Sequence, residues 1–163
     1  MKAAFIDRDG VINVDKGYLF RIRDFEYQNG VLSFLKMLQK KSFSLFIITN
    51  QSGIGRGIYT ETDMKNLHKW LISDLRKYGI DIEQIKFCPH LPSENCNCRK
   101  PKTGMIQQIL NSYPNIELDR SILIGDKNSD IQCGKNAGVK FNFKINTETF
   151  DTSDQFSNIA KQL

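Results

Sequence analysis

The sequence predicts a single α/β domain with a central parallel sheet that helices cover on both faces. Three observations predict it: short apolar segments that stop abruptly at polar residues, helical spacing of apolar residues between those segments, and a length suited to one core. The chain has 163 residues, of which 40% are hydrophobic and 25% charged, as in ordinary globular proteins. We therefore expect one domain over residues 1–163.

The apolar segments are the predicted strands. Asp7 ends the first segment, Thr49 the second, and Gly125-Asp126 a later one. Short continuous apolar runs bounded by polar turns are typical of strands in a buried parallel sheet. The signal is weaker in the third and fifth segments. The five predicted strands cover residues 3–6, 44–48, 85–87, 121–124 and 139–143.

Helical stripes of apolar residues fill the intervals between the predicted strands. Thr60 followed by Asp63 resembles the capping signal that begins a helix, and it precedes the longest stripe. His68 lies beside that stripe, where we expect an ordinary histidine at the helix surface or boundary. The stripes run over residues 31–38, 64–78, 103–110 and 128–131.

Polar residues follow the predicted strands and should meet at one edge of the sheet, because the carboxyl ends of parallel strands lie together. Asp7 and Asp9 follow the first strand, Thr49 and Asn50 the second, and Asp126 a later one. A turn is the ordinary interpretation of an isolated Asp-x-Asp-Gly. Three carboxylates at one sheet edge repel one another unless a cation or proton intervenes. Oxygen ligands of this kind suit Mg²⁺.

Charge and hydropathy exclude several function classes. The formal net charge of +5 is spread along the chain without a polybasic run, so we expect no nucleic-acid partner. No apolar run is long enough to cross a membrane, and the N-terminus lacks the apolar region of a secretory signal. We expect a cytoplasmic monomer without a membrane partner. A weak basic excess suits a phosphorylated ligand of any size.

Three further segments could bind an anion. The glycines of TNQSGIGRG would let backbone amides approach phosphate, although a flexible turn explains them equally. Lysines in RKPKTG would be solvated surface groups without further context. GDKNSD carries Asp126, Lys127 and Asp130 at a strand end. These segments occupy residues 49–57, 99–104 and 125–130.

Together with FIDRDG, these segments resemble, in order, the four motifs of the haloacid-dehalogenase-like (HAD) phosphohydrolases over about residues 3–140. The resemblance implies a Rossmann-like three-layer sandwich and a phosphoaspartyl mechanism. By it, Asp7 is the nucleophile, Asp9 the general acid and then base, and Thr49 and Lys100 stabilise the phosphoryl oxygens. Its Mg²⁺ ligands are Asp7, Asp9 and Asp126.

The mechanism implied by the resemblance requires a particular protonation state of Asp9. Its carboxyl group must be protonated when the leaving alkoxide departs, so we expect an elevated pKa beside other negative charge. Asp130 is expected to orient its neighbours. Only a turn segment and one helix fit between Asp9 and Thr49, so we expect no cap domain.

Cysteine and histidine cluster within an eleven-residue segment. Cys88, His90, Cys96 and Cys98 supply a complete tetrahedral set of zinc ligands with no position left for water. We expect structural Zn²⁺ that pins the loop delivering Arg99 and Lys100. The alternative is a reduced, metal-free loop whose cysteines serve as small apolar residues. Cys133 lies outside the cluster and is expected to pack in the core.

Two segments expected near the substrate resemble a narrower group of proteins within this family. VDKGY at residues 14–18 and SGIGRG at residues 52–57 are similar to the heptose-bisphosphate phosphatases of bacterial heptose nucleotide synthesis. That resemblance implies a small phosphorylated sugar as substrate, losing its 7-phosphate. The residues that it implies for substrate binding are Asp15, Lys16, Gly17, Tyr18, Thr49, Asn50, Gln51, Ser52, Arg99, Lys100 and Lys127.

Other functions stay open at this point. CPHLPSENCNCRKPK, with only five residues between His90 and Cys96, resembles the zinc loop of the histidinol-phosphate phosphatase domain. That relative lacks the VDKGY and SGIGRG features, so the heptose interpretation is preferred. A DNA 3′-phosphatase would need a basic groove. A non-catalytic zinc-loop interaction module would not need Asp7, Asp9, Lys100 and Asp126 together.

Overall fold

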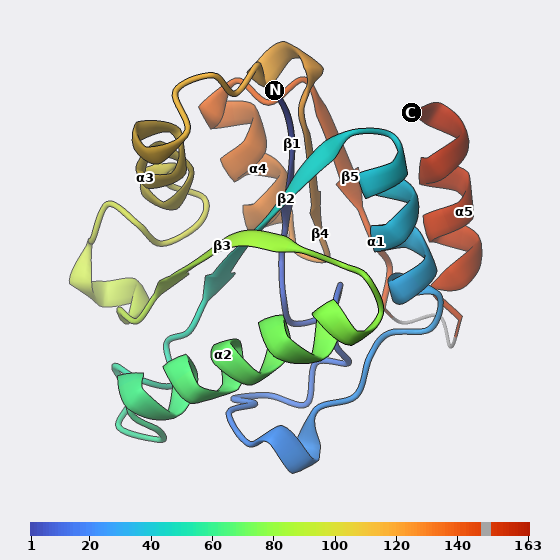
Figure 1. The fold of residues 1–163 in the computed structure, drawn as a ribbon. Coiled ribbons are helices and arrows are strands. Elements are labelled where there is room, and N and C mark those ends of the chain that lie inside the picture. Colours follow the sequence, from blue (N-terminus) through green and yellow to red (C-terminus); the bar gives the residue numbers. More distant parts are fainter. Residues whose placement is uncertain (148–150) are drawn as a thin grey trace.

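The computed structural model describes residues 1–147 and 151–163, and its centre is a five-stranded parallel sheet (Figure 1). The strand order is β3-β2-β1-β4-β5, which puts the first strand of the chain in the middle. This arrangement confirms the predicted α/β class and all five predicted strands. The strands are β1 (Lys2–Ile6), β2 (Phe43–Asn50), β3 (Ile82–Cys88), β4 (Ile122–Gly125) and β5 (Phe141–Lys144).

Helices cover both faces of the sheet, as the buried residues of β1 show. Ala4 and Ile6 belong to a core formed with α1, α2 and α5, whereas Ala3 and Phe5 belong to a second core formed with α3 and α4. Side chains alternate between the faces of a strand, so an apolar run such as this one is buried on both sides. The helices are α1 (Val31–Lys40), α2 (Glu61–Lys77), α3 (Gly104–Ser112), α4 (Asn128–Ala137) and α5 (Ser153–Gln162).

Local signals explain where α2 begins. The Thr60 side chain accepts a hydrogen bond from the Asp63 backbone amide, and the Asp63 carboxylate accepts one from the Thr60 amide. Both contacts satisfy donors that a helix N-terminus leaves free, as the sequence predicted. Within the described residues, no helix combines the length and apolar character that a membrane crossing requires.

Two features differ from the sequence expectations. The helix α5 was not predicted, because only Phe156 and Ile159 are buried in it; Phe156 stacks on Phe34 of α1, with ring centroids 4.7 Å apart. His68 was expected at the surface or boundary of α2, but it is 6% exposed. Its burial depends on a partner from another part of the chain, described below.

The turn after β1 brings two strand ends close together. Gly10 has φ of +89°, and a Cβ there would lie 2.5 Å from Asp126 Oδ2. Only glycine allows both that backbone conformation and that approach of the β1 turn to the end of β4. In the long connection from β1 to α1, the described helical structure is the short 3₁₀ helix Ile22–Asp24.

Candidate active site

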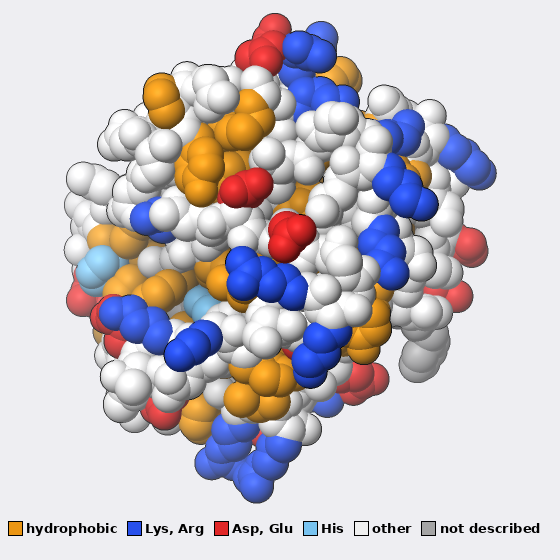
Figure 2. Space-filling view, viewed as in Figure 1, with side chains coloured by type: hydrophobic (Ala, Val, Ile, Leu, Met, Phe, Trp, Pro, Cys, Tyr) orange, Lys and Arg blue, Asp and Glu red, His pale blue; other side chains and the backbone are white. Residues whose placement is uncertain are grey.

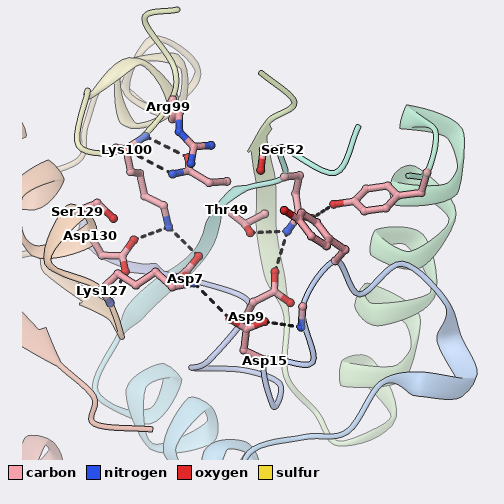
Figure 3. A pocket seen from close by; sticks show the side chains of 15 residues that line it. Asp7, Asp9, Asp15, Thr49, Ser52, Arg99, Lys100, Lys127, Ser129 and Asp130 are labelled. Atoms are coloured by element: carbon pink, nitrogen blue, oxygen red, sulfur yellow. Dashed lines mark hydrogen bonds and ion pairs between the residues drawn. The ribbon is translucent and has the colours of Figure 1, made fainter. Parts of the chain in front are cut away.

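A cavity of about 450 Å³ opens at the carboxyl ends of β1, β2 and β4 (Figure 3). Ten of the eleven residues predicted to bind substrate line it. The exception is Lys16, whose ammonium forms an exposed ion pair with Glu26 at 2.9 Å. The sequence did not single out Tyr59 and Ser129. The lining consists of Asp7, Asp9, Asp15, Gly17, Tyr18, Thr49, Asn50, Gln51, Ser52, Tyr59, Arg99, Lys100, Lys127, Ser129 and Asp130.

Lys100 is a buried cation at the floor of this cavity. Its Nζ lies 2.7 Å from Asp7 Oδ1 and 2.7 Å from Asp130 Oδ1, and it donates to the Ile48 carbonyl at 2.9 Å. All three donor positions of the ammonium group are therefore used. Asp130, expected as an orienting group, holds Lys100 next to Asp7.

The charges of Lys100 and its partners depend on one another. Burial raises the pKa of Asp7 to about 8, although the Lys100 ammonium opposes the rise. Burial lowers the pKa of Lys100, but the Asp7 and Asp130 carboxylates outweigh it, and the net shift is upward. Lys100 is therefore a cation at neutral pH, and additional positive charge near Asp7 would favour its ionised form.

Asp7, Asp126 and Asp130 present one carboxylate oxygen each within 4.8 Å of one another. Among the described residues, the buried Oδ1 of Asp126 has no hydrogen-bond partner. An unpaired buried oxygen beside two further carboxylates fits a hard divalent cation such as Mg²⁺. The Asp9 carboxylate lies outside this group, and the predicted role of Asp9 as a magnesium ligand stays a prediction.

Asp9 lies instead in a set of hydrogen-bond donors. Arg8 Nη2 donates to both of its oxygens, at 2.9 and 2.8 Å, Asn13 Nδ2 donates at 2.9 Å, and Gln51 Nε2 at 2.8 Å. Burial raises the pKa of Asp9, but the Arg8 charge and these hydrogen bonds outweigh it and lower the pKa. The predicted elevated pKa is therefore wrong for this arrangement, because Arg8 stabilises the charged form.

The end of β2 connects the two halves of the site. Gln51 Nε2 donates to Thr49 Oγ1 at 2.8 Å as well as to Asp9, and Tyr59 Oη donates to Gln51 Oε1 at 2.6 Å. Asn50 Oδ1 accepts from the Lys100 backbone amide at 3.1 Å. Gln51 thus joins Thr49 to Asp9, while Asn50 fixes the segment that carries Lys100.

Opposite charges meet at the mouth of the cavity. Lys127 Nζ lies 3.3 Å from Asp15 Oδ2 and 4.0 Å from Asp126 Oδ2, although the two aspartates are far apart in sequence. Tyr18, 48% exposed, stands at the same mouth. In the view of Figure 2, Lys and Arg side chains form several groups separated by other side chains.

A second cluster of potential metal ligands lies on the loop after β3. The Sγ atom of Cys98 is 3.1 Å from that of Cys88, 3.6 Å from that of Cys96 and 3.2 Å from His90 Nδ1. A tetrahedron with Zn–S bonds of about 2.3 Å has S–S edges of about 3.8 Å, so these ligand atoms are gathered slightly closer than zinc would hold them. The donor set therefore fits zinc. The cysteines are free, and Cys133 lies buried outside the cluster, as predicted.

The same loop continues directly into the cavity floor. Arg99 Nη1 donates to the His90 carbonyl at 3.4 Å, and Lys102 Nζ donates to Asn95 Oδ1 at 2.7 Å and to the Cys96 carbonyl at 2.8 Å. Lys100 stands between these two anchors. The position of the loop consequently sets the position of the Lys100 ammonium.

Comparisons with known proteins agree with the geometry. A model of the polynucleotide kinase 3 phosphatase family matches residues 3–161. The D-glycero-α-D-manno-heptose-1,7-bisphosphate 7-phosphatase of Photorhabdus laumondii is 45% identical over 154 residues, covering 90% of this chain and 84% of that relative. The D-glycero-β-D-manno-heptose-1,7-bisphosphate 7-phosphatase of Helicobacter pylori (strain J99) is 45% identical over 152 residues, covering 93% of this chain and 87% of that relative.

A solved structure shows the same fold. The chain is similar to the D,D-heptose 1,7-bisphosphate phosphatase from B. bronchiseptica, complexed with magnesium and phosphate, with a TM-score of 0.84. The two chains share 24% identity, and each is covered over 100% of its length. The family match, the curated relatives and the fold lead to one conclusion. The chain belongs to the D-glycero-D-manno-heptose-1,7-bisphosphate 7-phosphatase family, within the HAD-type phosphatases.

Proposed function

We propose that this phosphatase removes the 7-phosphate of D-glycero-D-manno-heptose 1,7-bisphosphate through an aspartyl-phosphate intermediate. The observation that carries the proposal is the arrangement at the cavity floor. There the Lys100 ammonium pairs with the Asp7 carboxylate, and Asp9, two residues further along the chain, lines the same cavity. The names of the similar proteins supply the substrate. The proposal includes a role for this reaction in the synthesis of nucleotide-activated heptose.

In the first step, an oxygen of Asp7 forms a bond to the 7-phosphorus while the bond from phosphorus to the sugar oxygen breaks. The electron pair leaves with the sugar oxygen, and Asp9 gives that oxygen a proton. The phosphate of the substrate brings negative charge next to Asp9 and raises its pKa relative to the free site, which favours the protonated form.

In the second step, a water oxygen attacks phosphorus and its proton passes to Asp9. The electron pair of the phosphorus–oxygen bond returns to Asp7, and phosphate leaves. The lowered pKa of Asp9 beside Arg8 suits the return of its proton to solvent between turnovers. Lys100 and the Thr49 hydroxyl face the equatorial phosphoryl oxygens, where they stabilise the developing charge.

Magnesium would be held by Asp7 and Asp126, and when bound it would neutralise charge on the phosphoryl oxygens. The unpaired Asp126 oxygen supports this assignment. Zinc would be held by Cys88, His90, Cys96 and Cys98, with a structural role, since four protein ligands leave no open position.

Cationic groups near the mouth suit the rest of a bisphosphate. Arg99 and Lys127 line the same cavity as Lys100. They would bind the second phosphate and the sugar hydroxyls together with Asp15, Tyr18 and the other lining residues. The names of the similar proteins include both the α and the β anomer of the heptose bisphosphate. The anomer that this enzyme prefers is therefore determined by assaying the two substrates separately.

We also propose that the chain works as a monomer in the cytoplasm. Thiolates in a zinc cluster persist in a reducing compartment, which supports this location. Light scattering of the purified protein tests the monomer, since a mass twice that of the chain would contradict it.

The substrate is tested by measuring phosphate release side by side from α- and β-heptose 1,7-bisphosphate, histidinol phosphate and a 3′-phosphorylated oligonucleotide. We expect the highest kcat/KM with a heptose bisphosphate. A preference for histidinol phosphate would overturn the substrate while leaving the mechanism standing. Asp7→Asn and Asp9→Asn serve as controls, and near-normal turnover in either would contradict the mechanism.

A further inference from the structure

Arg8 lies between the two catalytic aspartates in the sequence, and the proposed mechanism involves it only through its effect on the pKa of Asp9. The Arg8 side chain is 0% exposed. Burying a guanidinium is costly unless its charge is paired and its donors are satisfied. The partners of Arg8 therefore indicate what the residue does.

The guanidinium contacts two different parts of the fold with its two ends. Nη2 donates to both carboxylate oxygens of Asp9 and to the Leu19 carbonyl at 3.0 Å. Nη1 faces α2, where it lies 2.8 Å from Met64 Sδ and 3.0 Å from His68 Nε2. One rigid planar group thus links the general acid to a helix on the face of the sheet.

His68 is suited to the role of a fixed acceptor. Burial and the Arg8 charge lower the pKa of His68 to about 3, so the ring is neutral at physiological pH. A neutral ring with its proton on Nδ1 accepts at Nε2 from Arg8. The ring packs edge-on against Phe87 of β3, with centroids 5.7 Å apart, which limits its rotation.

We infer that His68 is a positioning residue for catalysis, which acts through Arg8 to aim the Asp9 carboxyl group at the leaving oxygen. The inference rests on the proposed function, because it takes Asp9 as the general acid. Without the imidazole, Nη1 keeps only the thioether of Met64, a weak acceptor, and the guanidinium can tilt. Asp9 would then keep its charge partner but lose its direction. Gln51, held by Tyr59, fixes Asp9 from the other side.

A misdirected general acid has a specific kinetic signature. Departure of a sugar alkoxide needs a proton, whereas p-nitrophenolate leaves readily without one. The quantity kcat/KM reports steps up to formation of the aspartyl phosphate, so it isolates the departure of the leaving group. The ratio of kcat/KM for an alkyl phosphate to kcat/KM for p-nitrophenyl phosphate therefore measures the contribution of Asp9 as an acid.

The test compares His68→Leu with His68→Gln, whose amide oxygen can accept from Arg8. We expect His68→Leu to lower the alkyl-to-aryl ratio about 10- to 100-fold, since general acid catalysis is worth roughly 10²–10⁴ and only its alignment is lost. His68→Gln should restore the ratio to within about threefold of the wild type. Leu71→Ala, at a buried position one turn along α2, is the control for loss of stability.

Thermal unfolding of each variant accompanies the kinetics. Leu71→Ala should unfold at lower temperature yet keep the wild-type ratio, because it creates a cavity in the apolar core and removes no partner of Arg8. An unchanged ratio in His68→Leu would overturn the inference, as would failure of His68→Gln to exceed His68→Leu. If His68→Leu does not fold, the comparison is made between His68→Gln and His68→Met.

The outcome is separate from that of the proposed substrate. Heptose bisphosphate is one alkyl substrate, and glycerol phosphate and sorbitol 6-phosphate are two others. A wild-type enzyme inactive on heptose bisphosphate contradicts the proposed function, while the ratio on the other alkyl phosphates still decides the role of His68. Absence of all phosphatase activity in the wild type would overturn both.

Discussion

Two clusters of potential metal ligands occur among the residues that the structure describes, and they are built in opposite ways. Cys88, His90, Cys96 and Cys98 come from one short loop, and their ligand atoms already face one another. Asp7 follows β1, Asp126 follows β4 and Asp130 lies in the first turn of α4. Lys100, a cation from another segment of the chain, pairs with the carboxylates of Asp7 and Asp130. The first cluster is closed, and the second opens into a cavity.

This difference separates a structural site from a reactive one. A closed set of four ligands leaves a metal nothing to exchange, so its value lies in fixing the chain. An open carboxylate set keeps room for water and phosphate. The two sites meet in the sequence at Cys98-Arg99-Lys100, so the closed site positions the cation of the open one.

The largest expected effect is that of Asp7→Asn. Loss of the nucleophile should lower kcat on the order of 10⁴-fold or more, as for removal of other catalytic nucleophiles. Asparagine keeps the shape of the side chain and an oxygen that can accept from Lys100, so the fold and the zinc content should not change. Kinetics, circular dichroism and metal analysis check this. Loss of zinc in Asp7→Asn would show that the cysteine cluster depends on the carboxylate cluster, contrary to the comparison above.

Lys100→Met removes the cation of the open cluster. We expect kcat to fall about 10²–10³-fold, the range for loss of one group that stabilises transition-state charge. In metal-free protein the variant should be less stable by roughly 3–5 kcal/mol, because Asp7 and Asp130 lose their buried partner. Chemical unfolding with and without Mg²⁺ measures this.

Magnesium should stabilise Lys100→Met more than it stabilises the wild type, because a divalent cation replaces the missing charge. An equal effect of Mg²⁺ on both proteins would show that the carboxylates do not form its site.

The local construction of each cluster also decides what the sequence could predict. The zinc-type set was predictable from spacing alone, and the strand ends that carry Asp7, Thr49 and Asp126 from short apolar runs. The burial of Arg8 was not predictable, because arginine is usually exposed. Its contact with His68 was not predictable either, because the two residues are 60 positions apart in the sequence. The charge of the buried Arg8, together with hydrogen bonds from Asn13 and Gln51, is what made the predicted elevated pKa of Asp9 wrong.

Two smaller differences between the sequence analysis and the structure have similar causes. Lys16 lies within the VDKGY segment, yet its exposed side chain pairs with Glu26 outside the cavity lining, which a linear motif does not reveal. Helix α5 was missed because two buried residues in ten give little periodicity. Side-chain direction and long-range packing, and not the placement of strands, limited the sequence prediction.

Cys96→Ser tests the closed cluster, with Cys133→Ala as a matched control outside it. We expect Cys96→Ser to lose zinc and to become less stable by about 3 kcal/mol or more, since zinc binding contributes directly to folding. Its kcat should fall about tenfold, because displacement of Lys100 weakens alignment at Asp7. Cys133→Ala should keep one zinc per chain. Full stability of zinc-free Cys96→Ser would show that the loop is held without metal.

The smallest effect is expected for Lys102→Met, which removes a polar brace of the closed cluster while leaving its ligands intact. Lys102 Nζ contacts the carbonyl of Cys96 and the side chain of Asn95, but no ligand atom. Zinc affinity should therefore fall less than about tenfold, below the roughly 10–100-fold cost of removing a group that bonds a ligand directly. Competition with a chelator measures the affinity. A larger loss would mean that the loop, and not the ligand set, determines zinc binding, and the cluster would then be as dependent on its surroundings as the carboxylates are.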